Sequence, residues 1–289
     1  MQKKTILAAG GDLRFVSAVR ALAKEYRVCA AGFTRQFLPD SDITLVTSAA
    51  DTLPPCDALM LPMPVSDDGI LVNAPFSRQS IPLASLTAHL RPDALVLGGR
   101  FGETRTLFED AGFPVIDYLC SEELAACNAV PTAEGAVQIL LEEMPRTIHD
   151  SRILVLGFGR IGTRLACLLK AMGAEVTVAA RQGADRSRAQ MLGCKAVDYP
   201  QIIPADYDVF CNTVPAKVIS EAMLAGMQPD ALILDLASKP GGVDLDAAQR
   251  LNRRVIWALS LPGKTAPVTA GEIIARTVGH LLEERGNAG

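Results

Sequence analysis

Short apolar segments alternate along the whole chain with segments whose apolar residues recur at helical spacing. The apolar segments are typical of buried parallel strands, and the alternation therefore predicts an α/β protein. In the first half we expect strands at Thr5–Ala9, Val28–Gly32, Ala58–Leu61, Ala94–Leu97 and Val115–Asp117, with helices such as Phe15–Lys24 between them. These strands are enough for one doubly wound parallel sheet.

A second series of strands begins at Ile153. We expect it at Ile153–Leu156, Glu175–Ala180, Ala196–Val197, Asp208–Cys211, Leu232–Leu236 and Val255–Leu259, which is the number in a complete dinucleotide-binding Rossmann fold. Between the two series, residues 128–145 predict a connecting helix that starts at Pro131, with Thr132 or Asn128 as its cap.

The two series predict two domains. Residues 1–127 are expected to form a flavodoxin-like substrate domain, and residues 128–289 a Rossmann domain that binds NAD(P). A last helix, at about residues 270–289, is expected to pack back on the first domain.

A glycine-rich turn follows the first strand of the second series. Its glycines are Gly157, Gly159 and Gly162, and Arg160 and Ile161 open the amphipathic helix that follows. In this context the first glycine permits the tight turn, the second lets a pyrophosphate approach the backbone, and the third lets helix and strand pack closely. The pattern predicts that a dinucleotide binds here with its phosphates at the helix N-terminus.

The second strand of this series ends at Arg181, where an acid often binds the adenosine ribose. A guanidinium cannot accept the proton of a ribose hydroxyl, but it pairs well with a 2′-phosphate. Arg181 therefore favours NADP over NAD, and Arg186 and Arg188 could add to the same patch. The alternatives are a solvated arginine and NAD as the cofactor.

Polar loops follow the later strands at the edge where ligands bind in this fold. The candidate cofactor-binding residues are Asn212, Thr213, Val214 and Pro215 after the fourth strand, and Asp235 and Ser238 after the fifth. Lys239 follows in the same loop, and Lys264 lies after the sixth strand. Each of these loops could instead be only a turn, because Gly, Pro, Ser and Asn favour turns for conformational reasons.

Charged residues also follow strands of the first domain. Asp12 comes after the first strand and is either a helix cap or a catalytic or ligand-binding residue. Arg14 and Arg100 are placed to clamp carboxylates, which the guanidinium fork matches.

The composition narrows the function classes. The chain has 289 residues, 49% of them hydrophobic, and its net charge is −4 with Lys and Arg scattered along it, which argues against nucleic acid or a membrane surface as partner. No uninterrupted apolar run reaches membrane-spanning length, and the N-terminus does not resemble a secretory signal. The seven cysteines form no CxxC pair and suggest buried thiols of a cytosolic protein without a metal site. None of the three histidines lies in a candidate ligand loop, which disfavours the histidine–acid pair of 2-hydroxyacid dehydrogenases.

Several of these loops, taken together, resemble a known family. The segments GGDLR, LPMPVSDDG, NAVPTAEGA, VLGFGRIG, NTVP, DLASKPGGVD and LPGKTAPVTAG occur in the order and spacing of the dipicolinate synthase A-subunit family of endospore-forming bacteria. The resemblance extends from about Ile6 to Leu282. More distantly, the second half is similar to the cofactor domains of alanine dehydrogenase and methylenetetrahydrofolate dehydrogenase.

The resemblance implies oxidation of dihydrodipicolinate, or of its hydrated 4-hydroxytetrahydro precursor, to pyridine-2,6-dicarboxylate in the cytoplasm of the sporulating mother cell. It also implies a partner, the flavoprotein-like B subunit, and a homo-oligomer is possible. Such a heterocyclic dicarboxylate needs cationic anchors and a base. The candidates for substrate binding are Arg14, Arg100, Lys239 and Thr132, and those for the catalytic base are Asp12, Glu134 and Lys264.

Two other functions stay open at this point. One is a different NADP-linked dehydrogenase, acting on an amino acid, an imine or a folate. The other is a regulatory or scaffolding subunit that binds the nucleotide without turnover, since binding alone requires the same glycine loop.

Overall fold

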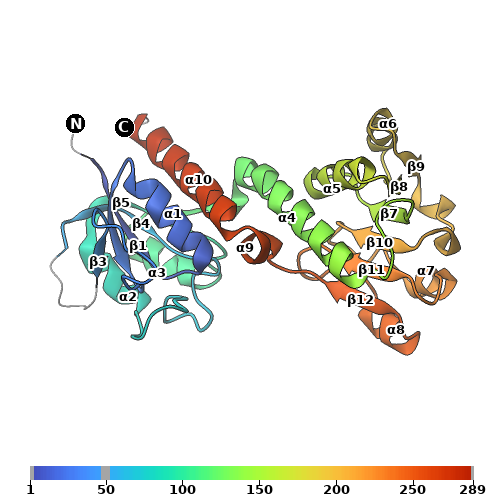
Figure 1. Cartoon of the computed structure of the whole chain (residues 1–289). Coiled ribbons are helices and arrows are strands. Elements are labelled where there is room, and N and C mark those ends of the chain that lie inside the picture. The colour runs from blue at the N-terminus through green and yellow to red at the C-terminus, as the bar shows by residue number, and fades with distance from the viewer. Residues whose placement is uncertain (1–2, 47–52, 288–289) are drawn as a thin grey trace. The chain divides into compact units, whose positions relative to one another are not determined.

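The structure, a computed structural model, describes residues 3–46 and 53–287. The chain forms two compact units, each with a doubly wound parallel sheet (Figure 1). Unit 1 comprises residues 1–127 and 266–289, and unit 2 comprises residues 128–265. The α/β fold class predicted from the sequence is confirmed.

The sheet of unit 1 contains every strand expected in the first half and one more. All of its strands are parallel, in the order β3-β2-β1-β4-β5-β6. They are β1 (Thr5–Ala9), β2 (Arg27–Ala31), β3 (Thr44–Val46), β4 (Cys56–Met60), β5 (Leu90–Gly98) and β6 (Val115–Asp117). Without β3 the order is that of flavodoxin, and the edge strand β3 extends it to the order of a dinucleotide-binding fold. The strand β3, a short edge strand without a buried residue, was not predicted from the sequence.

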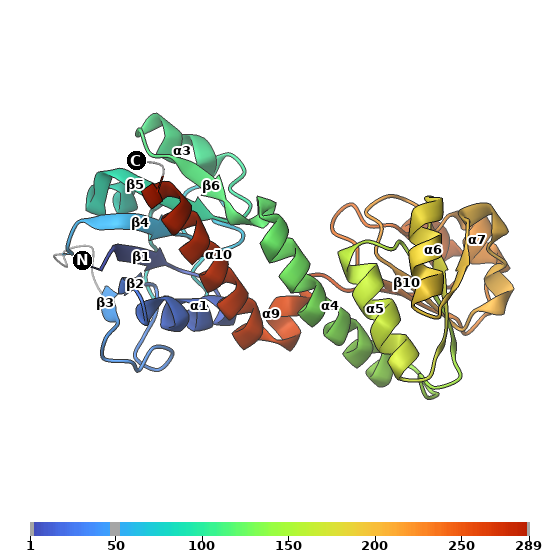
Figure 2. The ribbon, with the colours of Figure 1, turned by 90° about the horizontal axis from the view of Figure 1, so that it is seen from above.

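Helices cover the sheet of unit 1 on both faces. They are α1 (Leu13–Ala23), α2 (Leu83–Leu86), α3 (Thr104–Asp110) and α10 (Pro267–Asn287). Helices α1 and α10 lie side by side on one face, although they come from opposite ends of the chain (Figures 1 and 2). Their backbones approach closely at Gly271, where a Cβ atom would lie 2.2 Å from the carbonyl oxygen of Arg14.

Helix α4 (Glu122–Glu143) corrects one prediction. We expected a helix that starts at Pro131, but the helix begins nine residues earlier and Pro131 lies inside it. A proline inside a helix removes one backbone hydrogen bond. The Thr132 hydroxyl donates to the carbonyl of Asn128 over 2.7 Å, so Thr132 lies within the helix and does not cap it.

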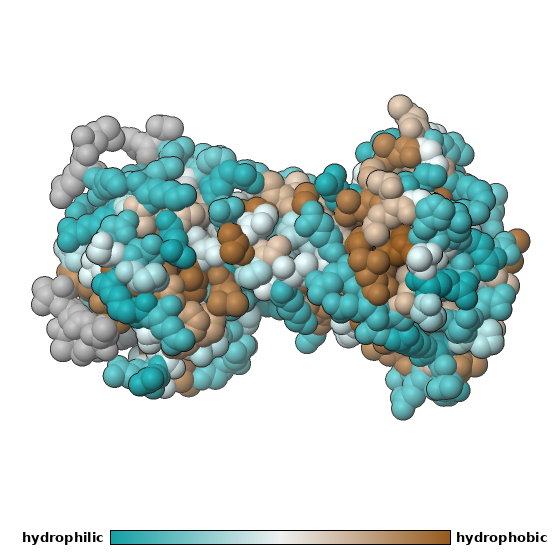
Figure 3. Space-filling view, viewed as in Figure 1, coloured by the Kyte–Doolittle hydropathy of each residue, from teal (hydrophilic) through white to brown (hydrophobic). Residues whose placement is uncertain are grey.

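Helix α4 is also long and apolar enough to cross a membrane, by length and composition alone. It contains no uninterrupted apolar run of that length, because Glu134 lies within it, and so it was not predicted as a candidate span. The core helix of a soluble protein passes the same test, and Leu124, Ala133, Ala136 and Leu140 of α4 lie buried in the hydrophobic cores of the two units. On the face drawn in Figure 3, hydrophilic residues cover most of each unit.

The sheet of unit 2 follows the prediction to within two residues at each end. Its parallel strands are β7 (Arg152–Leu156), β8 (Glu175–Ala179), β9 (Lys195–Val197), β10 (Val209–Asn212), β11 (Leu232–Asp235) and β12 (Arg254–Trp257), in the order β12-β11-β10-β7-β8-β9. The helices are α5 (Arg160–Ala171), α6 (Gly183–Met191), α7 (Glu221–Gly226), α8 (Leu245–Arg250) and α9 (Leu261–Thr265). This strand order reverses between β7 and β10, and ligands bind at such a reversal, beyond the carboxyl ends of the strands.

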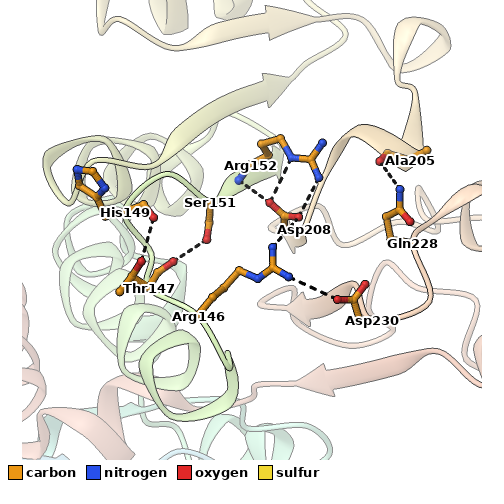
Figure 4. A network of polar contacts seen from close by, with 9 residues as sticks. All are labelled: Arg146, Thr147, His149, Ser151, Arg152, Ala205, Asp208, Gln228 and Asp230. Atoms are coloured by element: carbon orange, nitrogen blue, oxygen red, sulfur yellow. Dashed lines mark hydrogen bonds and ion pairs between the residues drawn. The ribbon is translucent and has the colours of Figure 1, made fainter.

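An ion-pair network lies at the amino-terminal ends of the central strands of this sheet (Figure 4). Asp208, just before β10, accepts hydrogen bonds from the backbone N–H of Arg152 and from its Nη2 atom, both over 2.9 Å. Arg146 lies 3.4 Å from the same carboxylate and 3.6 Å from Asp230. The network joins the starts of β7 and β10. The loops of the candidate site lie at the opposite, carboxyl ends of the strands.

All seven cysteines are free thiols. Cys29, Cys56, Cys194 and Cys211 are buried as expected, but Cys120 is exposed at the end of a turn.

Candidate functional site

The glycine loop of unit 2 places its glycines in three different environments. Gly157 has a φ of +93°, which only glycine adopts readily. At Gly162 a Cβ atom would lie 2.2 Å from the carbonyl oxygen of Gly157, so any side chain would push α5 away from β7. At Gly159 a Cβ atom would meet no described atom within 4 Å. The loop thus provides a tight turn, a close helix contact and an open approach to the backbone, as a dinucleotide-binding loop requires.

The open position lies at the N-terminus of α5. Gly159 is the N-cap residue, and Arg160 and Ile161 form the start of the first turn. The first backbone N–H groups of a helix have no partner within it, and they lie at the positive end of the helix dipole. Because Gly159 lacks a side chain, a phosphate could reach these N–H groups.

Arg181 is exposed just beyond β8, and its side chain has no hydrogen bond or ion pair to any residue that the structure describes. The Arg186 side chain is engaged instead, since it donates to the carbonyls of Ala180 and Arg181 over 2.7 Å each. Arg188 pairs with Asp185 and lies over the Phe158 ring, 6.0 Å from its centre. Of the three arginines that we expected to form a patch, Arg181 is therefore the one that is available to a phosphate.

The loop after β10 is held by buried hydrogen bonds. Asn212 is fully buried, and its Nδ2 donates to Asp235 Oδ1 over 2.8 Å and to the Val214 carbonyl over 3.0 Å. Asp235 also accepts hydrogen bonds from the backbone N–H groups of Ala237 and Gly242, over 3.0 Å and 2.8 Å. Asn212 and Asp235 were predicted to bind the cofactor. Their side chains instead form hydrogen bonds within the protein, to each other and to backbone groups, and so hold the loops after β10 and β11 in place.

Thr213 and Val214 bear directly on the glycine loop. A Cβ atom on Gly157 would lie 2.6 Å from Thr213 Oγ1 and 2.8 Å from Val214 Cγ2. The Thr213 hydroxyl donates to the Leu156 carbonyl over 2.9 Å, which joins the ends of β7 and β10. Pro215 follows and is exposed. The residues predicted from this loop therefore lie beside the glycine loop.

The loop after β11 forms a turn packed against Trp257. The N–H of Gly241 donates to the Ser238 carbonyl over 2.8 Å, and Trp257 Nε1 donates to the Ala237 carbonyl over 2.9 Å. Ser238 and Lys239 are exposed at this turn. Sequence reasoning missed Trp257, which lies in a predicted strand and has no ligand-binding pattern around it.

In unit 1, Asp12 and Arg14 are bound to each other. Asp12 is the N-cap of α1 and accepts from the Arg14 N–H over 3.0 Å. The Arg14 guanidinium donates to the same carboxylate through Nε and Nη2, the latter over 2.7 Å, and its Nη1 contacts Met63 Sδ over 3.1 Å. The Arg14 side chain is only 13% exposed. Asp12 is thus a cap, one of its two predicted roles, and a carboxylate ligand could reach Arg14 only by replacing Asp12.

Arg100 is different. It is exposed, and its side chain has no hydrogen bond or ion pair within the described part of the chain. Its φ is +57°, and Asp117 Oδ2 accepts from its backbone N–H over 2.9 Å, so the strained backbone has a fixed partner. Arg100 is the guanidinium of unit 1 that is better placed to meet an anion.

Tyr118, Met63 and Gly99, which were not predicted as site residues, connect these loops. Tyr118 is fully buried, and its hydroxyl donates to the Leu61 carbonyl over 2.9 Å. Burial raises the pKa of Tyr118 well above its ordinary value, so the phenol is neutral. A Cβ atom on Gly99 would lie 2.8 Å from Met63 Cβ and 3.0 Å from the Tyr118 ring. The one available signal was that Met63 follows a predicted strand and that Asp117 ends another.

The other predicted substrate and catalytic residues lie in unit 2. The Thr132 side chain is nearly buried, and its hydroxyl is used within α4, so it has no proton to donate to a substrate. Glu134 is exposed on α4, and Lys264 is exposed on α9. The two helices touch beside these residues, because a Cβ atom on Gly135 would lie 2.6 Å from Thr265 Oγ1.

Comparison with known proteins identifies the chain's relatives. The family model for the N-terminal domain of the A subunit of dipicolinate synthase matches residues 5–119. The A subunit of dipicolinate synthase from Bacillus subtilis (strain 168) is 29% identical over 286 residues, covering 96% of both chains. The crystal structure of the same subunit from Bacillus halodurans has a TM-score of 0.90 at 29% identity and covers 97% of this chain and 98% of that one. The chain is a homologue of the dipicolinate synthase A subunit. The resemblance drawn from the sequence motifs is confirmed over nearly the whole chain.

The second half also matches a dehydrogenase cofactor domain. The model of the NAD-binding domain of D-isomer specific 2-hydroxyacid dehydrogenases matches residues 132–251, which include the glycine loop. L-Alanine dehydrogenase shares the fold alone, at 15% identity and a TM-score of 0.65 over 96% of this chain and 90% of its own. This homologue of the dipicolinate synthase A subunit therefore carries a nicotinamide-dinucleotide-binding domain of the oxidoreductase kind.

Proposed function

We propose that the chain is the dehydrogenase subunit that oxidises dihydrodipicolinate, or its hydrated 4-hydroxytetrahydro precursor, to dipicolinate, with NADP as the electron acceptor. The observation that supports this most is the glycine loop. Gly159 in this loop is open, and Arg181 beyond β8 is exposed, as NADP binding requires, and the chain is similar to the A subunit of dipicolinate synthase over 96% of its length.

Residues of unit 2 would hold the cofactor. The backbone of Gly157, Gly159 and Gly162 and the first turn of α5 would surround the pyrophosphate, and Arg181 would pair with the 2′-phosphate. Asn212 and Asp235 would keep the neighbouring loops in place. A bound nicotinamide would supply the hydride acceptor. Dihydrodipicolinate would give up one hydride and one proton to become aromatic, and the hydrated precursor would lose one water molecule in addition.

Residues of unit 1 would bind the substrate carboxylates. Arg100 is the first candidate, because its guanidinium is exposed and unpaired among the described residues. Arg14 is the second, and a substrate carboxylate would take the place of Asp12, which would then be free to accept the proton. Lys239, Lys264 and Glu134 remain proposed contacts or bases on unit 2, each of them exposed.

The same relationship supports a partner and a cellular setting. We infer that the chain acts with a flavoprotein-like B subunit in the cytoplasm of the sporulating mother cell. Neither an extended basic surface nor a metal is needed for this reaction.

A spectrophotometric assay tests the proposal. Freshly generated dihydrodipicolinate and NADP are mixed with the chain alone, and then with the chain and the B subunit together, while absorbance is followed at the reduced-nicotinamide band. We expect the band to appear with the chain alone and to be lost in Gly159→Ala, which closes the approach to the backbone. Gly279→Ala, whose Cβ atom would lie 3.7 Å from its nearest neighbour in unit 1, is the matched control. Dipicolinate formed only with the B subunit, at the same rate with Gly159→Ala, would instead support a scaffold.

A further inference from the structure

Unit 1 contains a hollow that the proposed reaction does not use. It has a volume of about 520 Å³ and lies on the face of the sheet opposite α1 and α10. Its floor is Leu7 of β1, Ala31 of β2 and Val46 of β3, and Phe76 and Ile81 form a wall. We call it the β1–β3 pocket.

The arrangement of helices explains why this pocket exists. Helices α1 and α10 cover the other face of the sheet, and α3 packs beside β6. Over β1, β2 and β3, the pocket face is covered in the described residues by α2, which has four residues, by the turn Thr87–His89 and by irregular chain. So short a helix cannot fill the space above three strands. The volume lies within the ~300–1,000 Å³ that small-molecule sites occupy.

The charges around the β1–β3 pocket select the kind of ligand. Its described lining includes no Asp or Glu residue. Arg78 and His89 both line it, and the Arg78 side chain is without a hydrogen bond or ion pair to any described residue. The floor and wall are aliphatic and aromatic. A molecule that fits therefore has an apolar body and one negative charge.

We propose that the β1–β3 pocket is a binding site for a small carboxylate with an aromatic or aliphatic body. Neither the glycine loop nor Asp12, Arg14 or Arg100 lines it. Ligand binding here is therefore distinct from the binding of cofactor and from that of the proposed dicarboxylate substrate.

The first experiment uses 1-naphthoate as the probe and its neutral analogue 1-naphthamide as the comparison. The full chain is labelled at the methyl groups of Ile and Leu and titrated by NMR. We expect saturable shifts at Ile81 and Leu86, which line the pocket, while Ile161 beside the glycine loop does not move. We expect 1-naphthamide to bind about threefold more weakly, since an exposed ion pair contributes about 0.2–1 kcal/mol. Absence of saturable naphthoate binding at Ile81 and Leu86 would overturn the proposal.

A pair of variants tests the place of binding. Ala88 and Ala84 are both exposed, but only Ala88 lines the pocket. Ala88→Phe is expected to weaken both probes by about tenfold or more, because the phenyl ring takes the apolar contacts of the ligand. Ala84→Phe is the control and is expected to bind like the wild type. Equal binding by the two variants would contradict the proposal, and thermal unfolding verifies that both are folded.

Arg78→Gln tests the charge. The substitution breaks no hydrogen bond in the described structure, so the fold is expected to persist. We expect it to weaken 1-naphthoate about threefold and to leave 1-naphthamide unchanged, since only the carboxylate interacts with the guanidinium. An equal loss for both probes would mean that Arg78 does not recognise the charge.

Discussion

A methyl group at Gly162 has no room in the glycine loop. Its Cβ atom would lie 2.2 Å from the carbonyl oxygen of Gly157 and 3.2 Å from Thr213 Oγ1. Real Cβ contacts are essentially never shorter than 3.0 Å, so α5 and the loop must separate by about 0.8 Å. Overpacking of this kind costs ~1–3 kcal/mol. We therefore expect Gly162→Ala to lower the Tm of unit 2 by roughly 3 °C for each kcal/mol lost.

Gly159→Ala is the informative partner of this variant. Its Cβ atom would meet no described atom within 4 Å, and its φ of −79° suits alanine. The loss of a glycine at the N-cap position and the gain from a less flexible unfolded chain are each below about 1 kcal/mol and oppose each other. Stability is therefore expected to stay near that of the wild type, while the methyl group stands where the pyrophosphate must approach. We expect the affinity for NADPH to fall by about a hundredfold, as when hydrogen bonds to a charged ligand are lost.

Thermal unfolding with and without NADPH separates the two effects. A ligand at a hundred times its Kd adds about 2.7 kcal/mol to the stability of a protein that binds it only when folded. The wild type and Gly279→Ala should show this gain, Gly159→Ala should lack it, and Gly162→Ala should begin from a lower Tm. Isothermal titration with NADPH gives the affinities directly. Wild-type affinity in Gly159→Ala would refute the assignment of the glycine loop as the phosphate site.

Three further predictions concern charged residues. Arg181→Asp is expected to lower the affinity for NADPH roughly tenfold to a hundredfold and that for NADH much less, because only NADPH presents a 2′-phosphate to the guanidinium. Calorimetry with both nucleotides measures the two affinities, and equal losses would contradict this prediction. Arg100→Gln should raise the KM for the dicarboxylate about tenfold and leave NADPH affinity unchanged, whereas an unchanged KM would exclude Arg100 as an anchor. Arg152 holds the pKa of Asp208 below its ordinary value, so the pair stabilises unit 2 above the ordinary aspartate range and loses this effect as the pH falls through the lowered pKa. Asp208→Asn is expected to cost ~1–3 kcal/mol in denaturant unfolding at neutral pH, and its deficit should shrink in acid; a constant deficit would count against the ion pair.

Four strands of unit 2, β7, β8, β10 and β11, could be predicted closely from the sequence because almost all of their residues are buried. Continuous apolar segments such as Ile153–Leu156 and Leu232–Leu236 carry this signal, and the glycine turn marks where the first of them ends. β3 carries no such signal. It pairs along one edge only, and none of its residues is buried, so neither length nor apolar content distinguishes it from a loop.

The start of α4 illustrates a different limit. Pro131 suits the first turn of a helix, and local rules place a helix start there. The nine preceding residues extend the helix instead, since Leu124 and Ala129 are buried and contribute to packing. Tertiary packing thus outweighs one missing backbone hydrogen bond. A rule based on neighbouring residues contains no information about this packing and therefore places the helix start too late.

Charged residues at the candidate site show why position after a strand does not define a role. Arg14 follows β1 and Arg100 follows β5, so the strand pattern treats them alike. The acid that caps α1 lies two residues before Arg14 and takes three of its donor contacts, whereas the acid near Arg100 binds only its backbone N–H. Asp12 occupies the N-cap position of α1, and the guanidinium of an arginine two residues later is close enough to pair with its carboxylate. A basic residue two positions after a capping Asp is therefore a weaker candidate for an anion site than Arg100 in its glycine-rich loop, where the neighbouring carboxylate binds the backbone and not the guanidinium.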